Sequence, residues 1–342
     1  MEQERLVFVV SPPRAGSTLL QRMLGSHSQI FTHPEPHLIT PLAYLGYYDT
    51  VDQAPYDHIN AAEALRLFVE GLPRGEEDYL DALRAFTQTL YGRMLEPSGK
   101  RYFLDKTPAY ALVLPFLSKL HPRAKYIVLT RHPLAVFSSY ANSFFGGDWR
   151  AAHHFNPLLE RYVPAIARFL RDREVSPLQV AYESLVEESE SELKRIFGYL
   201  ELEHEAGAVE YGERFEVKKG PGDPHNVGRF KRPVTAFRDA WVDEVRADRV
   251  KGDMARAMLE RLDPSDIESW GYSLEETWQA LEGDPAAARS PLRKQKTNWY
   301  AVQRKVLLML REDVHRRPHG RLIRRLRYYC DVILRDQQTS HS

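Results

Sequence analysis

The stretch that decides the fold runs from Leu6 to Leu20 and reads LVFVVSPPRAGSTLL. Its first part, Leu6–Val10, is apolar and rich in β-branched residues, which is typical of a buried strand in a parallel sheet. The turn-like segment Pro12–Ser17 follows, and from Ser17 to Leu24 apolar residues recur at helical spacing until Gly25. A strand, a glycine-containing loop and a helix in this order open a nucleotide-binding α/β fold.

The loop of this stretch has the groups that bind an anion. The first amides of a helix are unpaired and lie at the positive end of its dipole, so they attract phosphate. Gly16 permits a close approach of the backbone, and Arg14 adds a permanent forked charge. A magnesium–ATP loop has a glycine at its start and a lysine before the Ser/Thr, and this loop has neither. The loop therefore predicts a phosphate site of another kind, and an ordinary βα turn is the simpler alternative.

A second strand end extends this prediction. Tyr126–Thr130 reads as a strand, followed by Arg131-His-Pro and a helix over residues 134–143. Ligands of open α/β sheets bind at the carboxyl ends of strands, where Arg131 stands. Arg131 and Ser139 can together hold a second phosphate. Each residue alone is equally well explained as a surface residue, but the pair favours a ligand with two phosphates.

The rest of the chain alternates between strand and helix patterns. Strands are predicted at residues 102–104 and 178–182, and helices at 61–95, 188–200 and 238–262. This alternation predicts a P-loop-type central parallel sheet flanked by helices, with a helical extension at the C-terminus. We expect the α/β domain at residues 1–282, a Gly/Pro-containing linker at 283–291 and two basic helices within 292–338.

Composition and charge narrow the class of protein. The chain has 342 residues, of which 43% are hydrophobic and 27% charged, so a sizeable core can form. Its formal net charge of zero argues against bulk nucleic-acid binding, although fourteen Lys/Arg stand against four Asp/Glu from Arg289 onward. Cys330 is the single cysteine, and Leu6–Val10 is too short for a signal or membrane segment. We therefore expect a cytoplasmic protein without internal disulfides.

Four segments resemble motifs of the sulfotransferases that use 3'-phosphoadenylyl sulfate (PAPS). Pro13–Leu20 is similar to that family's 5'-phosphosulfate loop, and Leu129–Ser139 is similar to its 3'-phosphate motif. Val180–Val186 resembles a tyrosine-containing strand end, and Lys218–Asp223 resembles the basic segment that closes over the 3'-phosphate. The resemblance spans Leu6–Trp241 and implies PAPS as co-substrate. The residues that it implies for PAPS binding are Arg14, Ala15, Gly16, Ser17, Thr18, Leu19, Arg131, Ser139, Tyr182, Lys219 and Gly220.

Within this family the chain is more similar to the tyrosylprotein and bacterial branch than to the cytosolic branch. The cytosolic enzymes usually have a lysine where Arg14 stands and a catalytic histidine near positions 105–110, where this sequence has none. Thr32–His37 instead resembles the segment that carries the carboxylate base of the tyrosylprotein branch. The resemblance implies that Glu35 is the general base and that Lys106 and Arg14 stabilise the leaving phosphate. His37 is the alternative base, because histidine titrates near neutral pH.

Other functions and partners stay open on the residues alone. A P-loop phosphotransferase would need ATP and magnesium, and the missing lysine of the loop speaks against it. A protein that binds adenosine 3',5'-bisphosphate (PAP) without catalysis is the third possibility. We expect no metal and no nucleic acid, and a hydroxyl acceptor that is a small molecule, a glycan or carrier-bound. The basic C-terminal helices can contact an acidic partner or an anionic surface, or can simply pack as a solvated pair.

Overall fold

The computed structural model describes residues 2–45, 58–172, 174–214 and 230–282, together with six positions near the C-terminus. These six are Val302, Gln303, Val306, Leu322, Arg325 and Leu326. The chain divides into two compact units, Met1–Ser139 with Leu158–Leu292, and Tyr140–Pro157 with Arg293–Ser342. The first unit holds the central sheet and all candidate site residues that the structure describes.

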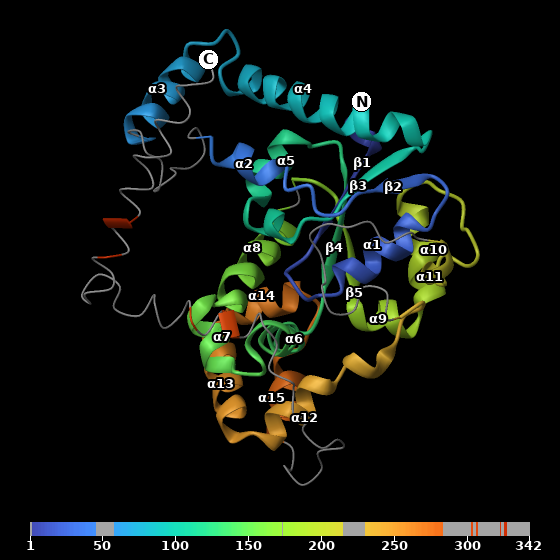
Figure 1. The fold of residues 1–342 in the computed structure, drawn as a ribbon, viewed down its shortest axis with the longest axis vertical. Coiled ribbons are helices and arrows are strands. Elements are labelled where there is room, and N and C mark those ends of the chain that lie inside the picture. The colour runs from blue at the N-terminus through green and yellow to red at the C-terminus, as the bar shows by residue number, and fades with distance from the viewer. Residues whose placement is uncertain are drawn as a thin grey trace. The chain divides into compact units, whose positions relative to one another are not determined.

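The sheet has five parallel strands (Figure 1). They are β1 (Leu6–Val10), β2 (Ile30–Thr32), β3 (Tyr102–Asp105), β4 (Lys125–Thr130) and β5 (Leu178–Ala181), in the order β2-β3-β1-β4-β5. Central strand β1 is buried along its whole length, as its apolar sequence predicts. Because all pairings are parallel, the carboxyl ends of the five strands lie along one edge of the sheet.

Helices connect and cover the strands. The α-helices are α1 (Ser17–Gly25), α2 (Ile39–Ala43), α3 (His58–Glu70), α4 (Glu76–Leu95), α5 (Leu114–Leu120), α6 (Pro133–Phe145), α7 (Trp149–Phe155), α8 (Leu158–Asp172), α9 (Tyr182–Glu187), α10 (Ser189–Tyr199), α11 (Tyr211–Arg214), α12 (Ala240–Ala247), α13 (Arg249–Leu259), α14 (Pro264–Ser269) and α15 (Leu274–Glu282). The 3₁₀ turns are η1 (Gln3–Arg5), η2 (Glu96–Ser98), η3 (Pro108–Leu112) and η4 (Thr235–Phe237). Within the described residues, none of these helices is long and apolar enough to cross a membrane.

The strands alternate their side chains between two buried faces. On one face Val7 and Val9 pack with residues of α1, α9 and α10, such as Leu20, Leu185 and Phe197. On the other face the ring of Phe8 contacts aromatic rings of α4, η3 and β4. Figure 1 shows these two helical layers, with α1, α9 and α10 on one side of the sheet and α4, α5 and α8 on the other. The predicted fold class is therefore confirmed.

Three sequence-based boundaries were wrong for local reasons. The predicted helix over 61–95 is broken between α3 and α4, where Gly75 adopts a positive φ of 57°. The predicted helix over 238–262 is broken because the carboxylate of Asp248 caps a new helix, accepting from the amides of Val250 and Lys251. Tyr182, predicted as the last strand residue, is the first residue of α9.

The predicted extension is largely outside the described residues. The linker at 283–291 and most of residues 292–338 belong to this part, so the domain boundaries stay predictions. The six described C-terminal positions are helical.

Candidate functional site

A candidate site residue follows the carboxyl end of every strand of the sheet. The loop with Arg14 follows β1, Glu35 follows β2, and Lys106 follows β3. Arg131 comes directly after β4, and Tyr182 comes directly after β5. Since the strands are parallel, these five segments meet at one edge of the sheet, which is where open α/β sheets bind ligands.

The loop after β1 leaves the amino end of α1 open. Gly16 is the N-cap of α1 with φ 95°, a conformation that favours glycine, and it has no side chain to cap the first amides. Those amides belong to the first turn, Ser17–Leu19, and they suit a phosphate. Arg14 also has a positive φ of 72°, and its Nε donates to the hydroxyl of Ser139 on α6 at 3.3 Å. The structure thus brings together the loop and the predicted serine of the second motif.

Arg131 is buried behind this loop. Its Nη1 donates to the carbonyl of Arg14 at 3.1 Å, and its Nη2 donates to the carbonyl of Phe237 at 2.6 Å. Its guanidinium carbon lies 4.3 Å from the ring centroid of Tyr182, a cation–π contact. Burial lowers the pKa of Arg131 and raises that of Tyr182. Within the described part of the chain, Nε of Arg131 is buried and makes no hydrogen bond, so a donor is left for a ligand.

Two adjacent serines of α6, Ser138 and Ser139, have different partners. The hydroxyl of Ser138 donates to Glu244 of α12, and Lys251 of α13 donates to the same carboxylate at 2.5 Å. Ser139 instead accepts from Arg14 of the phosphate loop. Ser139 thus contacts the loop that carries Arg14, and its role in phosphate binding stays a prediction.

Lys106 and Glu35 form an ion pair at the sheet edge. Nζ of Lys106 lies 2.5 Å from Oε1 of Glu35, while the lysine side chain is 1% exposed and the glutamate 14%. Nε2 of His37 lies 3.6 Å from the other oxygen of Glu35, and His37 is 48% exposed. The two candidate bases are therefore neighbours, and Glu35 is the one that the cation contacts directly.

A buried polar cluster lies beneath Lys106. The carboxylate of Asp105, with no exposed surface, accepts from the hydroxyls of Tyr91 at 2.6 Å, Thr107 at 2.9 Å and Tyr110 at 3.1 Å. Burial raises the pKa of Asp105 to about 6, against the lowering effect of these hydrogen bonds and of Lys106. The cluster fixes the turn that follows β3.

The raised pKa of Asp105 predicts a pH-dependent stability. The folded state binds this proton more tightly than the unfolded state, so its stabilising contribution is complete at low pH and is lost as pH rises through about 6. We expect the free energy of unfolding of the wild type, relative to Asp105→Asn, to fall by about 3 kcal/mol between about pH 4 and pH 7. Urea denaturation of both proteins across this range measures the difference, and parallel pH profiles would contradict it.

Two predicted residues, Lys219 and Gly220, lie outside the described residues. Conversely, the sequence analysis missed residues that support the site. Gln21 of α1 and Tyr110 of η3 make hydrogen bonds to the segment that carries Glu35. The ring of His132 stacks on Trp241 with centroids 4.2 Å apart, which ties α12 to the end of β4. No periodic pattern marks these residues, because their partners are far away in sequence.

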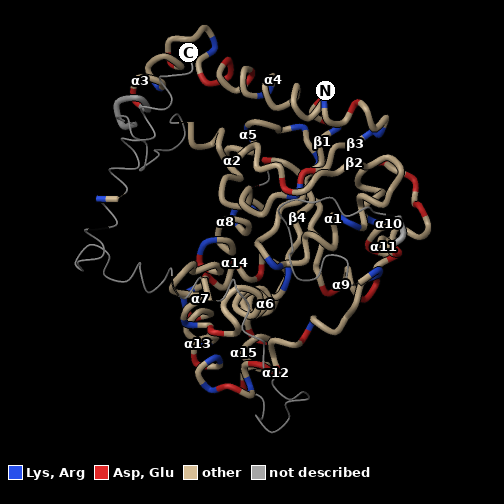
Figure 2. The backbone as a smooth tube through the Cα atoms, in the orientation of Figure 1, with Lys and Arg blue, Asp and Glu red and all other residues tan. Residues whose placement is uncertain are grey.

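The positive charge of the site is local. Basic and acidic positions are interspersed along the described backbone (Figure 2), so Arg14, Arg131 and Lys106 are distinguished by their place at the sheet edge. No group of three or more potential metal ligands is found among the described residues.

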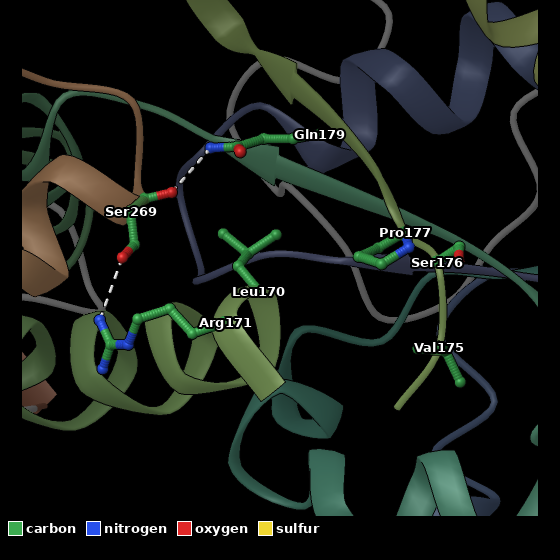
Figure 3. Close-up of a pocket in the computed structure, with 7 residues that line it drawn as sticks. All are labelled: Leu170, Arg171, Val175, Ser176, Pro177, Gln179 and Ser269. Atoms are coloured by element: carbon green, nitrogen blue, oxygen red, sulfur yellow. Dashed lines mark hydrogen bonds between the residues drawn. The ribbon is translucent and has the colours of Figure 1, made fainter. Parts of the chain in front are cut away.

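A cavity of about 530 Å³ lies elsewhere, at the amino end of β5 (Figure 3). It is lined by Leu170, Arg171, Val175, Ser176, Pro177, Gln179 and Ser269. Its polar groups are used internally, since both Arg171 and Gln179 donate to Ser269. The cavity is at the edge of the sheet opposite to Tyr182, so it is separate from the candidate site.

Comparison with known proteins gives a consistent result. A family model described as the sulfotransferase family matches residues 7–206, which include all candidate site residues except Lys219 and Gly220. Nodulation protein NoeE of Sinorhizobium fredii is 34% identical over 139 residues, 41% of this chain and 32% of NoeE. The chain thus matches about a third of that relative. A putative protein-tyrosine sulfotransferase of Caenorhabditis briggsae is 24% identical over 246 residues, 70% of this chain and 81% of the relative.

Two sulfotransferases are among the solved structures found by comparison. A sulfotransferase domain from the curacin biosynthetic pathway is 24% identical, with a TM-score of 0.46 over 69% of this chain and 89% of that domain. Mouse sulfotransferase SULT7A1, solved in complex with PAP, is 13% identical, with a TM-score of 0.44 over 81% of this chain and 90% of that chain.

Proposed function

The chain belongs to the sulfotransferase family, and from this premise we propose that it transfers a sulfuryl group from PAPS to a hydroxyl acceptor. The observation that carries the proposal is the pair of cationic positions at the sheet edge. One is the open amino end of α1 with Arg14, and the other is Arg131 with Ser139 and Tyr182. PAPS has a phosphosulfate at its 5' side and a phosphate at its 3' side, so it matches two such positions.

In the proposed complex each group has a defined part. The amides of residues 15–19 and Arg14 hold the phosphosulfate, and Arg131 with Ser139 holds the 3'-phosphate. Tyr182 presents its ring beside Arg131, and Lys219 and Gly220 would close over the 3' side, as the family resemblance implies.

The proposed reaction uses the ion pair of Glu35 and Lys106, which follow β2 and β3. The acceptor oxygen attacks sulfur and forms the new S–O bond, while its proton moves to the carboxylate of Glu35. The S–O bond to the 5'-phosphate breaks, and its electron pair stays on the phosphate oxygen of PAP. Lys106 and Arg14 stabilise this developing charge. The Lys106 ammonium has three donors, so it can contact Glu35 and a ligand oxygen together. The scheme uses no metal.

The base is tested by Glu35→Gln. We expect turnover to fall about 10²- to 10⁴-fold, because the amide cannot accept the acceptor proton. The Kd for PAP should stay within about threefold, because Glu35 does not contact the nucleotide in the proposed complex. His37→Asn is the matched control from the same segment and should retain most of its turnover. A strong loss of turnover in His37→Asn, together with full activity in Glu35→Gln, would instead assign the base to His37.

Ligand choice separates the proposal from its alternatives. Calorimetric titration of the whole chain should show binding of PAP without magnesium. Binding of ATP–magnesium with no response to PAP would overturn the proposal and favour a phosphotransferase. PAP binding with no transfer from radiolabelled PAPS to any of a panel of alcohols, phenols, glycans and carrier-bound hydroxyls would favour a non-catalytic PAP-binding protein.

A further inference from the structure

The segment that carries Glu35 is fixed at both ends by buried side chains from other elements. We propose that Gln21 and Tyr110 are positioning residues that hold the Glu35 carboxylate against Lys106. This inference rests on the proposed function for its catalytic part, and on hydrogen bonds of the described residues for its structural part. Gln21 comes from α1, whose amino end forms the phosphate loop, and Tyr110 comes from η3, just after Lys106.

The first end of the segment is held by Gln21. This side chain is 6% exposed, and its Nε2 donates to Oγ1 of Thr32 at 2.8 Å and to the carbonyl of His33 at 2.9 Å. The hydroxyl of Thr32 in turn donates to the carbonyl of Leu104 at 3.0 Å. One amide group therefore joins the phosphate-binding helix to β2 and, through Thr32, to the strand that leads to Lys106.

The second end is held by Tyr110. Its hydroxyl accepts from the backbone amide of Ile39 at 3.1 Å and donates to Asp105 at 3.1 Å. Its ring makes an edge contact with Phe8, with centroids 6.3 Å apart. Tyr110 is 1% exposed, so this link is sheltered from water. The hydroxyl thus connects the residue that begins α2 to the residue next to Lys106.

The backbone between the two ends has little freedom. Glu35 stands between Pro34 and Pro36, so φ is fixed on both sides and Glu35 itself is restricted as a residue before proline. Fixing both ends of such a stiff segment fixes the direction of the carboxylate. A base displaced by a fraction of the length of a hydrogen bond loses much of its effect, since proton transfer requires close approach.

The test compares buried side chains that are hydrogen-bonded to this segment with a buried hydroxyl that is not. Tyr110→Phe and Gln21→Met each remove the hydrogen-bonding group and keep the volume. We expect kcat with radiolabelled PAPS, and the best acceptor of the panel, to fall about 10- to 100-fold for each, with the Kd for PAP within about twofold. Tyr102→Phe is the matched control, because Tyr102 is at the amino end of β3 and its buried hydroxyl donates to the carbonyl of Leu200 at 2.8 Å. Its kcat should be that of the wild type.

A double-mutant comparison separates positioning from general loss of stability. If Tyr110 acts through Glu35, Tyr110→Phe should lower the residual kcat of Glu35→Gln by no more than about twofold. The full single-mutant loss in that background would overturn the inference. So would a Tyr110→Phe enzyme as active as the Tyr102→Phe control.

The hydrogen bond between Tyr110 and the Glu35 segment can be tested without measuring catalysis. Hydrogen exchange of the peptide that contains Ile39 should be faster in Tyr110→Phe than in the wild type or in Tyr102→Phe, because the amide loses its acceptor. Unchanged exchange would overturn the inference even if kcat falls. A wild type that never transfers sulfuryl groups would refute the proposed function instead, and the exchange result would still decide whether the segment is held as described.

Discussion

Lys106→Met is expected to lower turnover of PAPS about 10³-fold, because it removes the fixed cation beside the leaving phosphate. Lys106 is fully buried at the end of β3 and its ammonium contacts Glu35, so neither solvent nor a surface lysine replaces it. Methionine keeps most of the side-chain volume and removes the charge together with the N–H donors. The rate is measured in a single turnover of radiolabelled PAPS, so that product release does not mask the chemical step.

Two further variants separate the loss of turnover from a loss of stability. Lys106→Met leaves the Glu35 carboxylate without its cation, which costs stability. The double variant Lys106→Met/Glu35→Gln removes that unpaired charge, so we expect it to regain thermal stability and to stay inactive. Lys100→Met is the control from the loop that precedes the same strand, because Nζ of Lys100 donates to the carbonyls of His27 and Ile30 at the amino end of the sheet. Normal turnover in Lys106→Met, or an equal loss in Lys100→Met, would contradict the assigned role.

The sequence was sufficient where the signal is local. Strand β1 and the middle of β4 are apolar runs, so their burial could be predicted. Arg131 follows β4 directly, and Arg14 lies in the short loop after β1. The place of Gly16, in the turn between β1 and α1, could likewise be predicted from the local sequence. These local patterns were enough to predict the fold class and the sheet edge at which the candidate residues lie.

The sequence was insufficient where the signal is tertiary. Strand β2 has three residues, Ile30–Thr32, and periodicity cannot reveal so short a strand, yet it is what brings Glu35 to the sheet edge. The sequence pattern extends the strand to Tyr182, whereas the structure has this residue at the start of α9, with its ring against Gly16. The partners of Gln21 and Tyr110 depend on which strands are neighbours, and one sequence does not contain that information.

Gly16→Ala is expected to weaken PAP binding about 100-fold or more, because it disturbs both phosphate positions at once. The residue has φ 95°, where a side chain is strained, and an added Cβ would lie 2.5 Å from Cδ2 of Tyr182. Relief of this contact moves either the amino end of α1 or the ring on which Arg131 rests. Calorimetry with PAP measures the loss.

A second glycine separates the two causes of that effect. Gly99 also has a positive φ, 64°, but a Cβ there would meet no atom within 4 Å, and the residue lies at the amino end of β3. Gly99→Ala therefore introduces similar backbone strain without a collision and far from the sheet edge of the site. We expect it to lower thermal stability and to leave the Kd for PAP unchanged. If both variants lose PAP binding equally, backbone strain alone accounts for the loss, and the packing of Gly16 against Tyr182 is not what joins the two phosphate positions.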